Sequence, residues 1–133
     1  MVVAVTRLGF AMLALLVASP AAAPANLHVR QVVAKASPLP IEGAYGYVRV
    51  VREDGSKVLQ RRLRGRGLVP FTTVTLAPGR YHLLSWQRYC DGNCSRLDPP
   101  SDRCARWFRL HRGQRLVATI TVRYGSGCRI SYG

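Results

Sequence analysis

The residues of this sequence with the most specific chemistry are four cysteines, Cys90, Cys94, Cys104 and Cys128. Their spacings of four, ten and twenty-four residues lack the paired Cys-x₂-Cys knuckles of a structural zinc site. An even number of cysteines in a small exported chain instead predicts two disulfides. Three pairings are possible. We favour Cys94–Cys104, which closes a polar loop, together with Cys90–Cys128, which ties a strand end to the C-terminus.

Alternating arginines form the second chemically specific group. Arg62, Arg64 and Arg66 stand at positions i, i+2 and i+4, so in a strand they would share one face and span roughly 13 Å. Guanidinium groups pair well with phosphate, sulfate or carboxylate, and the run is therefore a candidate anion-binding site. The alternative is a solvated sheet face, because 18 of the 20 basic residues are arginine, a skew that a GC-rich genome also produces.

Three aromatic residues, Trp86, Tyr89 and Trp107, lie on either side of the cysteine-rich segment. Aromatic rings that stay exposed and flat can stack on sugars or anchor a protein partner. The alternative is that the tryptophans fill the core and the tyrosine hydroxyl reaches its rim. We treat the three residues as candidate recognition residues.

The sequence contains few residues in an arrangement that indicates a catalytic site. The three histidines are His28, His82 and His111, and the six carboxylates fall mostly in turns or loops. Neither a G-x-S-x-G nor an H-E-x-x-H motif occurs. A hydrolase needs a nucleophile beside a base, or two neighbouring carboxylates, and neither arrangement is indicated. We therefore expect a protein that is not an enzyme and that uses no metal or other cofactor.

The first 25 residues have the three-part layout of a secretory signal peptide. A short segment with one positive charge, residues 1–7, precedes the apolar run Leu8–Ala18 and then the small residues and prolines of Ser19–Ala25. The apolar run is short for a membrane anchor, which is the alternative. Cleavage after Ala25 or after Ala21 fits the small-residue rule. We expect a signal peptide over 1–25, a single domain over 26–133 and secretion to the extracellular space, with no membrane span after cleavage.

Length and charge limit the remaining function classes. The chain has 133 residues, a formal net charge of +14 and 48% hydrophobic residues. This length fits one domain, and the apolar fraction is too high for a disordered basic tail. The charge favours anionic partners in general. No zinc-finger, helix-turn-helix or RNP-type motif occurs, so we expect no specific nucleic-acid binding, and we expect a monomer.

Alternation with a period of two predicts the elements that must position these residues. Asp54-Gly55 between two alternating runs indicates a hairpin, and Ala77-Pro78-Gly79 indicates a turn. Seven or eight short strands at such spacing predict an all-β, antiparallel sandwich of immunoglobulin-like or transthyretin-like type, with two disulfides. The expected strands are 27–33, 45–52, 57–66, 68–76, 80–90, 107–111, 115–124 and 128–132.

A part of this pattern resembles a known group of domains. A D-G hairpin, here Asp54-Gly55, is followed by Phe71 and then by Leu76-Ala77-Pro78-Gly79-Arg80-Tyr81. This order is similar to the carboxypeptidase-regulatory-like and collagen-adhesin B-type domains, which are seven-stranded transthyretin-like sandwiches. The resemblance covers about 40 residues over Tyr45–Ser85. It implies a structural, adhesive or carrier-like module without catalysis, and no site residue is transferred from it.

These observations together predict a secreted, non-catalytic binding or structural module with a basic surface. Its expected partner is an anionic polymer of the cell envelope or a protein at the cell exterior. The alternative is a secreted inhibitor or effector that presents the cysteine-stapled loop 90–104 to a target protein, because stapled loops on rigid sheets commonly carry recognition.

Overall fold

Eight β-strands make up the regular structure in a computed structural model that describes residues 17, 21–34, 43–63, 70–90 and 94–133. No helix occurs in these ranges. The strands are β1 (Ala25–Val33), β2 (Gly43–Arg52), β3 (Lys57–Arg62), β4 (Phe71–Leu76), β5 (Gly79–Cys90), β6 (Ser101–Leu110), β7 (Arg115–Arg123) and β8 (Gly127–Tyr132).

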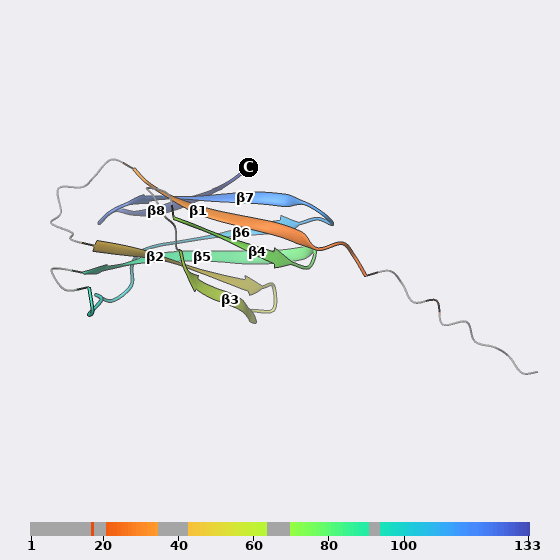
Figure 1. Cartoon of the computed structure of the whole chain (residues 1–133), viewed down its shortest axis with the longest axis horizontal. Helices are drawn as coiled ribbons and strands as arrows, with labels where there is room; N and C mark the ends of the chain where they lie inside the picture. Colours follow the sequence, from red (N-terminus) through yellow and green to blue (C-terminus); the bar gives the residue numbers. More distant parts are fainter. Residues whose placement is uncertain (1–16, 18–20, 35–42, 64–69, 91–93) are drawn as a thin grey trace, which may run out of the picture.

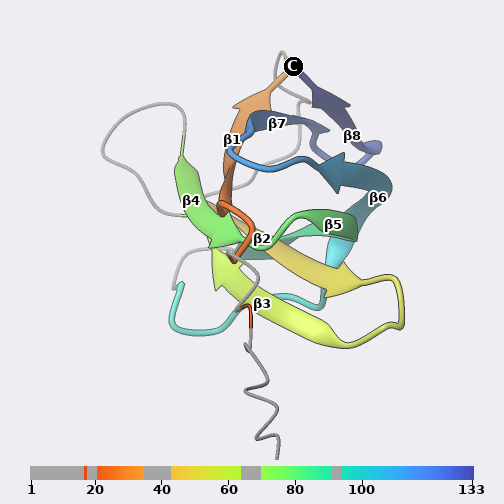
Figure 2. The ribbon, with the colours of Figure 1, turned by 90° about the vertical axis from the view of Figure 1, so that its right-hand side faces the viewer.

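The strands form two four-stranded sheets that pack face to face (Figure 1). One sheet has the order β4-β1-β7-β8, and the other has the order β3-β2-β5-β6. The end-on view shows β6 beside β8 at one edge of the sandwich, where the two sheets are in contact (Figure 2). The predicted all-β sandwich is therefore confirmed.

The core lies between the two sheets because each strand turns alternate side chains inward. Leu27 and Val29 of β1 are buried, and so is Ile120 of β7. They share one hydrophobic cluster with Val50 of β2 and Leu83 of β5 from the opposite sheet. The intervening residues of β2 and β5 point outward and are partly exposed, which leaves one long sheet face available for binding.

One strand pair departs from the predicted antiparallel pattern. β1 runs parallel to β7, with Leu27 opposite Leu116 and Val33 opposite Val122, whereas the other pairs are antiparallel. A hairpin imposes antiparallel pairing only on strands joined by a tight turn. Because most of the chain separates β1 from β7, that constraint does not apply to them, and the first sheet is mixed.

Two predicted strand bounds are wrong. The run expected over 107–111 belongs to a longer strand, β6, which begins at Ser101, because Ser101 and residues 104–110 pair with β5. The segment expected as a loop through Arg103 is correspondingly shorter. The strand expected over 57–66 ends at Arg62, and Arg64 and Arg66 lie outside the described residues.

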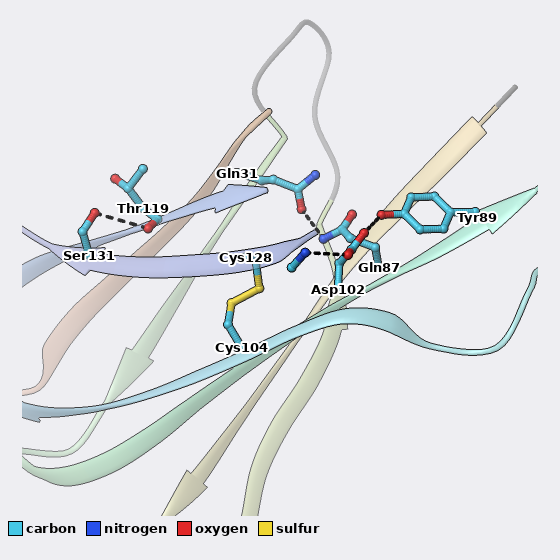
Figure 3. Close-up of a disulfide and its surroundings, with 9 residues drawn as sticks. Gln31, Gln87, Tyr89, Asp102, Cys104, Thr119, Cys128 and Ser131 are labelled. Atoms are coloured by element: carbon cyan, nitrogen blue, oxygen red, sulfur yellow. Dashed lines mark hydrogen bonds between the residues drawn. A yellow bond between two sulfur atoms is a disulfide. The ribbon is translucent and has the colours of Figure 1, made fainter. Parts of the chain in front are cut away.

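The disulfide pairing predicted from the sequence is also wrong. The bridges are Cys90–Cys94 and Cys104–Cys128, and the described chain has no free cysteine. Cys104 of β6 faces Cys128 of β8 because these two strands meet at the sandwich edge (Figure 3). The Cα atoms are 5.4 Å apart in this bridge and 5.1 Å apart in Cys90–Cys94, as disulfide geometry requires. The Cys104–Cys128 bridge links the two sheets, and the Cys90–Cys94 bridge joins two residues four positions apart at the end of β5.

A buried polar contact crosses the core near the same end. The Gln87 side-chain amide of β5 donates a 2.9 Å hydrogen bond to Gln31 Oε1 of β1 (Figure 3). Both side chains are buried. Gly46 lies opposite Gln87 in β2, and its missing side chain leaves room for the Gln31 amide. Glycine in a strand often marks such a close approach.

Candidate functional site

The outer face of the β3-β2-β5-β6 sheet gathers arginine and aromatic side chains from neighbouring strands. Strand register explains the arrangement, because side chains directly opposite one another on one face come into contact. Arg62, Tyr47 and Trp86 form one row across β3, β2 and β5. The next row contains Gln60, Arg49, Leu84 and Ala105.

The first aromatic unit lies at the centre of this face. The rings of Tyr47 and Trp86 are parallel within 5°, with centroids 5.7 Å apart. The Arg49 guanidinium carbon lies 5.4 Å from the centroid of the Trp86 ring. Its Nε also donates a 2.9 Å hydrogen bond to Gln60 Oε1. Stacking and hydrogen bonding together hold this guanidinium in place. Beside it, the Arg62 guanidinium carbon is 4.7 Å from the Tyr45 ring centroid.

A second unit of the same kind lies farther along β5. The rings of His82 and Trp107 are parallel within 5°, with centroids 4.4 Å apart. The Arg80 guanidinium carbon lies 4.8 Å from the Trp107 ring centroid. Its Nη1 is 2.9 Å from Oε1 of Glu53. Each cation–π contact contributes about 0.5–1 kcal/mol at an exposed site, so both units also stabilise the sheet.

A groove of about 670 Å³ runs over the first unit. Its floor contains the apolar side chains of Leu84, Trp86 and Ala105, and Arg49, Arg88 and Arg103 contribute positive charge. A guanidinium placed over an aromatic ring still has N–H groups that can bind an anion. The groove therefore combines an apolar floor with preorganised anion-binding groups.

One wall of the groove is fixed by the segment that follows the Cys90–Cys94 bridge. Arg88 Nε donates a 2.8 Å hydrogen bond to the carbonyl of Asp98, and its Nη2 donates one of 3.1 Å to the carbonyl of Leu97. Pro100 and Arg103 then line the groove. The cysteine-stapled loop predicted as a recognition element thus borders the arginine–aromatic groove in its described part.

Within the ranges that the structure describes, most arginines of this face have no ion-pair partner. Among the described residues, Arg80–Glu53 is the one ion pair with a nitrogen–oxygen distance of 4.0 Å or less. The carboxylate of Asp102 instead accepts a hydrogen bond from the Tyr89 hydroxyl (Figure 3). It also accepts hydrogen bonds from the backbone N–H groups of Gly125 and Gly127. Asp102 therefore ties β6 to the β7–β8 turn and neutralises no groove arginine.

The candidate residues from the sequence fall in different places. Trp86 lines the groove, and Arg62 is exposed and lies opposite the groove residue Tyr47 in the neighbouring strand. Trp107 is 41% exposed and belongs to the second aromatic unit. Tyr89 is outside both units, because its hydroxyl contacts Asp102 and its ring packs edge-on against Tyr124.

Several residues of the face were not among the candidates drawn from the sequence. They are Tyr45, Tyr47, Arg49, Arg80 and His82. The alternation of Tyr45, Tyr47 and Arg49 places them on one face of a strand, which is the signal that could have identified them. Their partners on β3, β5 and β6 depend on strand register, which only the fold provides.

The described part of the chain shows no candidate metal site and no candidate membrane-spanning helix. No set of three or more histidine, cysteine, aspartate or glutamate side chains is arranged to hold a metal ion there. None of the described segments contains a helix with the length and apolar character needed to cross a membrane. Away from the groove, burial raises the pKa of the Tyr124 phenol, and the Asp102 carboxylate raises it further.

Comparison with known proteins adds little to this geometry. No protein-family model matches the sequence, and no curated protein matches it either. Among solved structures, a chain titled "Structure of Sugar Binding Protein Pneumolysin" aligns with 83% of this chain and 23% of its own length. The identity is 13% and the TM-score is 0.26, so the alignment carries no argument about fold or function.

Proposed function

We propose that this protein is a secreted, non-catalytic binding module that contacts an anionic polymer at the cell exterior. The observation that carries the proposal is the groove on the β3-β2-β5-β6 sheet, where Arg49 is held against Trp86 beside an apolar floor. Immobilised guanidinium groups lose little side-chain entropy when they bind an anion. A polymer suits the site because the cationic and aromatic groups continue along the sheet from one unit to the next.

Two features support secretion. Residues 1–25 have the layout of a signal peptide, and both disulfides are built into the fold. Disulfides persist in oxidising compartments and are rare in the cytosol. The extracellular space is therefore the proposed location, and the net charge of +14 would concentrate anionic partners around the molecule.

The composition of the groove supports binding without catalysis. Its lining consists of arginine, aromatic and aliphatic side chains together with Gln60, Ser85, Pro100 and Cys104. General acid–base catalysis needs a group that titrates near the working pH within reach of the substrate. Arginine stays protonated at all such values, so these side chains are suited to holding an anion and not to moving protons.

The test compares two double variants with the same loss of charge. Arg49→Ala/Arg62→Ala removes two arginines of the groove face, and Arg115→Ala/Arg129→Ala removes two exposed arginines of the opposite sheet. Affinity for dextran sulfate, oligogalacturonate and a single-stranded oligonucleotide would be measured by calorimetry at about 0.05 and 0.5 M salt, where screening lengths differ severalfold.

We expect the groove variant to lose at least about tenfold in affinity for one of these polymers, and the control to lose about threefold or less. Equal losses in both variants, together with binding that disappears at high salt, would mean that net charge alone attracts the polymer. The proposal of a specific site would then be wrong.

A second candidate function uses the loop beside the groove. Because Arg88 holds the carbonyls of Leu97 and Asp98, the exposed residues Asp98–Pro100 present a fixed backbone to solvent. Such a segment could be the contact surface of a secreted inhibitor or effector. Saturable capture of one protein at both salt concentrations, lost on replacing Asp98–Pro100 with glycine and serine, would favour this function over polymer binding.

A further inference from the structure

We infer that the ligand of the groove is a linear acidic polysaccharide whose sugar carboxylates pair with Arg49. The inference rests on the proposed function and narrows it from anionic polymers in general to polyuronates. Its starting point is that the described residues contain two units in which an arginine lies over one of two parallel rings, and that the arginine of only one unit is paired with a carboxylate there.

The second unit shows how a carboxylate is bound. Arg80 is stacked on Trp107, and Glu53 reaches its Nη1 at 2.9 Å while that stacking is maintained. A guanidinium backed by an aromatic ring can therefore accept a carboxylate in this fold. Both side chains of the ion pair are largely solvent-accessible, with exposures of 46% and 64%, so the carboxylate approaches from the solvent side as a ligand would.

The first unit has the same parts without the acid. Arg49 lies over Trp86, and Gln60 accepts only from its Nε. No carboxylate of the described residues lies within 4.0 Å of this guanidinium. The terminal nitrogens of Arg49 therefore correspond to the nitrogen of Arg80 that binds Glu53. They face the groove, whereas that nitrogen of Arg80 faces a carboxylate of the same chain.

The floor of the groove indicates what carries the carboxylate. Leu84 and Ala105 lie directly opposite each other on β5 and β6, next to the Trp86 ring. An aliphatic and aromatic floor suits the C–H face of a sugar ring, whereas the guanidinium groups at the side suit its acidic substituent. His82, Leu84 and Trp86 share one face of β5, so the two units are about 13 Å apart along the strand. A linear oligosaccharide can follow this line from one unit towards the other.

The experiment measures calorimetric affinity of the oxidised protein for oligogalacturonate and for the methyl ester of the same oligomer. The ester keeps the sugar ring and removes the charge. We expect the acid to bind at least about tenfold more tightly than the ester. Arg49→Ala should weaken binding of the acid about tenfold, whereas Arg115→Ala, the single-charge control on the opposite sheet, should change it less than about twofold.

A variant with the opposite effect makes the test sharper. Glu53→Gln frees Arg80 for the ligand and should raise affinity for the acid about threefold. Asp54→Asn removes an equal charge from the neighbouring residue without freeing an arginine and should leave affinity within the measurement error. Because Glu53 and Asp54 are both exposed, neither change is expected to unfold the protein, and melting curves would check this for every variant.

Failure of the inference is distinguishable from failure of the proposed function. Equal binding of acid and ester, or unchanged affinity in Glu53→Gln, would overturn the assignment to polyuronates. Binding of dextran sulfate or the single-stranded oligonucleotide that depends on Arg49, without binding of oligogalacturonate, would also overturn it and would leave an anion-binding groove. If no groove variant loses affinity for any of the polymers, both the inference and the proposed function would be refuted.

Discussion

The close approach of Gly46 to the buried glutamine pair leads to a quantitative prediction. A Cβ atom added to Gly46 would lie 2.1 Å from Gln31 Oε1 and 3.3 Å from Gln87 Nε2. Real Cβ atoms do not approach other heavy atoms to 2.1 Å, so in Gly46→Ala the Gln31 amide must move. That movement breaks its hydrogen bond with Gln87, whose side chain is fully buried.

The expected cost combines two unfavourable effects with one favourable effect. A buried amide that loses its partner costs about 1–3 kcal/mol, and overpacking a core costs about 1–3 kcal/mol. Alanine is favoured over glycine in a strand by roughly 0.5–1 kcal/mol. The net prediction is that Gly46→Ala lowers the free energy of unfolding by about 3 kcal/mol, within a range of about 1–5 kcal/mol.

Urea denaturation followed by tryptophan fluorescence would measure this change, with Gly133→Ala as a control, because no heavy atom lies within 4 Å of a Cβ at that position. A double-mutant cycle isolates the cause. In the background of Gln31→Ala the added methyl group has space, so Gly46→Ala should cost less than about 1 kcal/mol there. An unchanged cost in that background, or a stability of Gly46→Ala within about 0.5 kcal/mol of the parent, would refute the reasoning.

Further predictions concern the crosslinks, the phenols and the N-terminus. Replacing the Cys104–Cys128 bridge with alanines should cost about 3.5 kcal/mol and replacing Cys90–Cys94 about 2 kcal/mol, because loop-closure entropy grows with the length of the loop; urea midpoints that rank in the opposite order would contradict this. Burial raises the pKa of Tyr132 well above its usual value, and the Arg106 charge lowers it less. The stability that the neutral Tyr132 phenol contributes should therefore be present below pH 10 and be lost as the pH rises further. Alkaline unfolding would check this, because the stability of Tyr132→Phe should fall less steeply with pH than that of the parent. We expect signal cleavage after Ala21, because Ala25 is fully buried in β1. An intact mass that corresponds to a mature chain starting at Asn26 would exclude cleavage after Ala21.

Local alternation made much of the fold predictable. The runs expected over 80–90 and 115–124 became β5 and β7 within one residue at each end. The N-terminal half of β6 escaped prediction because it lacks such alternation. Asp102 there has a φ of +46° and the register with β5 shifts nearby, so pairing with a neighbouring strand, and not the local sequence, determines its conformation.

The cysteine pairing and the groove depended on contacts between distant strands. The polar segment between them favoured pairing of Cys94 with Cys104, yet Cys104 lies beside Cys128 at the edge where the two sheets meet. In the same way, Trp86 and Arg62 were identifiable as single candidates. That Arg49 joins Trp86 follows from the β2–β5 register, which composition and spacing do not contain.

The parallel pairing of β1 with β7 also determines when the protein can fold. β1 lies between β4 and β7, and its partners on β7 are about 90 residues away along the chain. The first of the described strands, β1, must therefore wait for the seventh, β7, before its sheet is complete. Such non-local pairing slows folding to milliseconds or longer. A sheet that cannot be completed before β7 is available fits the proposed export, in which the chain crosses a membrane in extended form and folds and forms its disulfides afterwards.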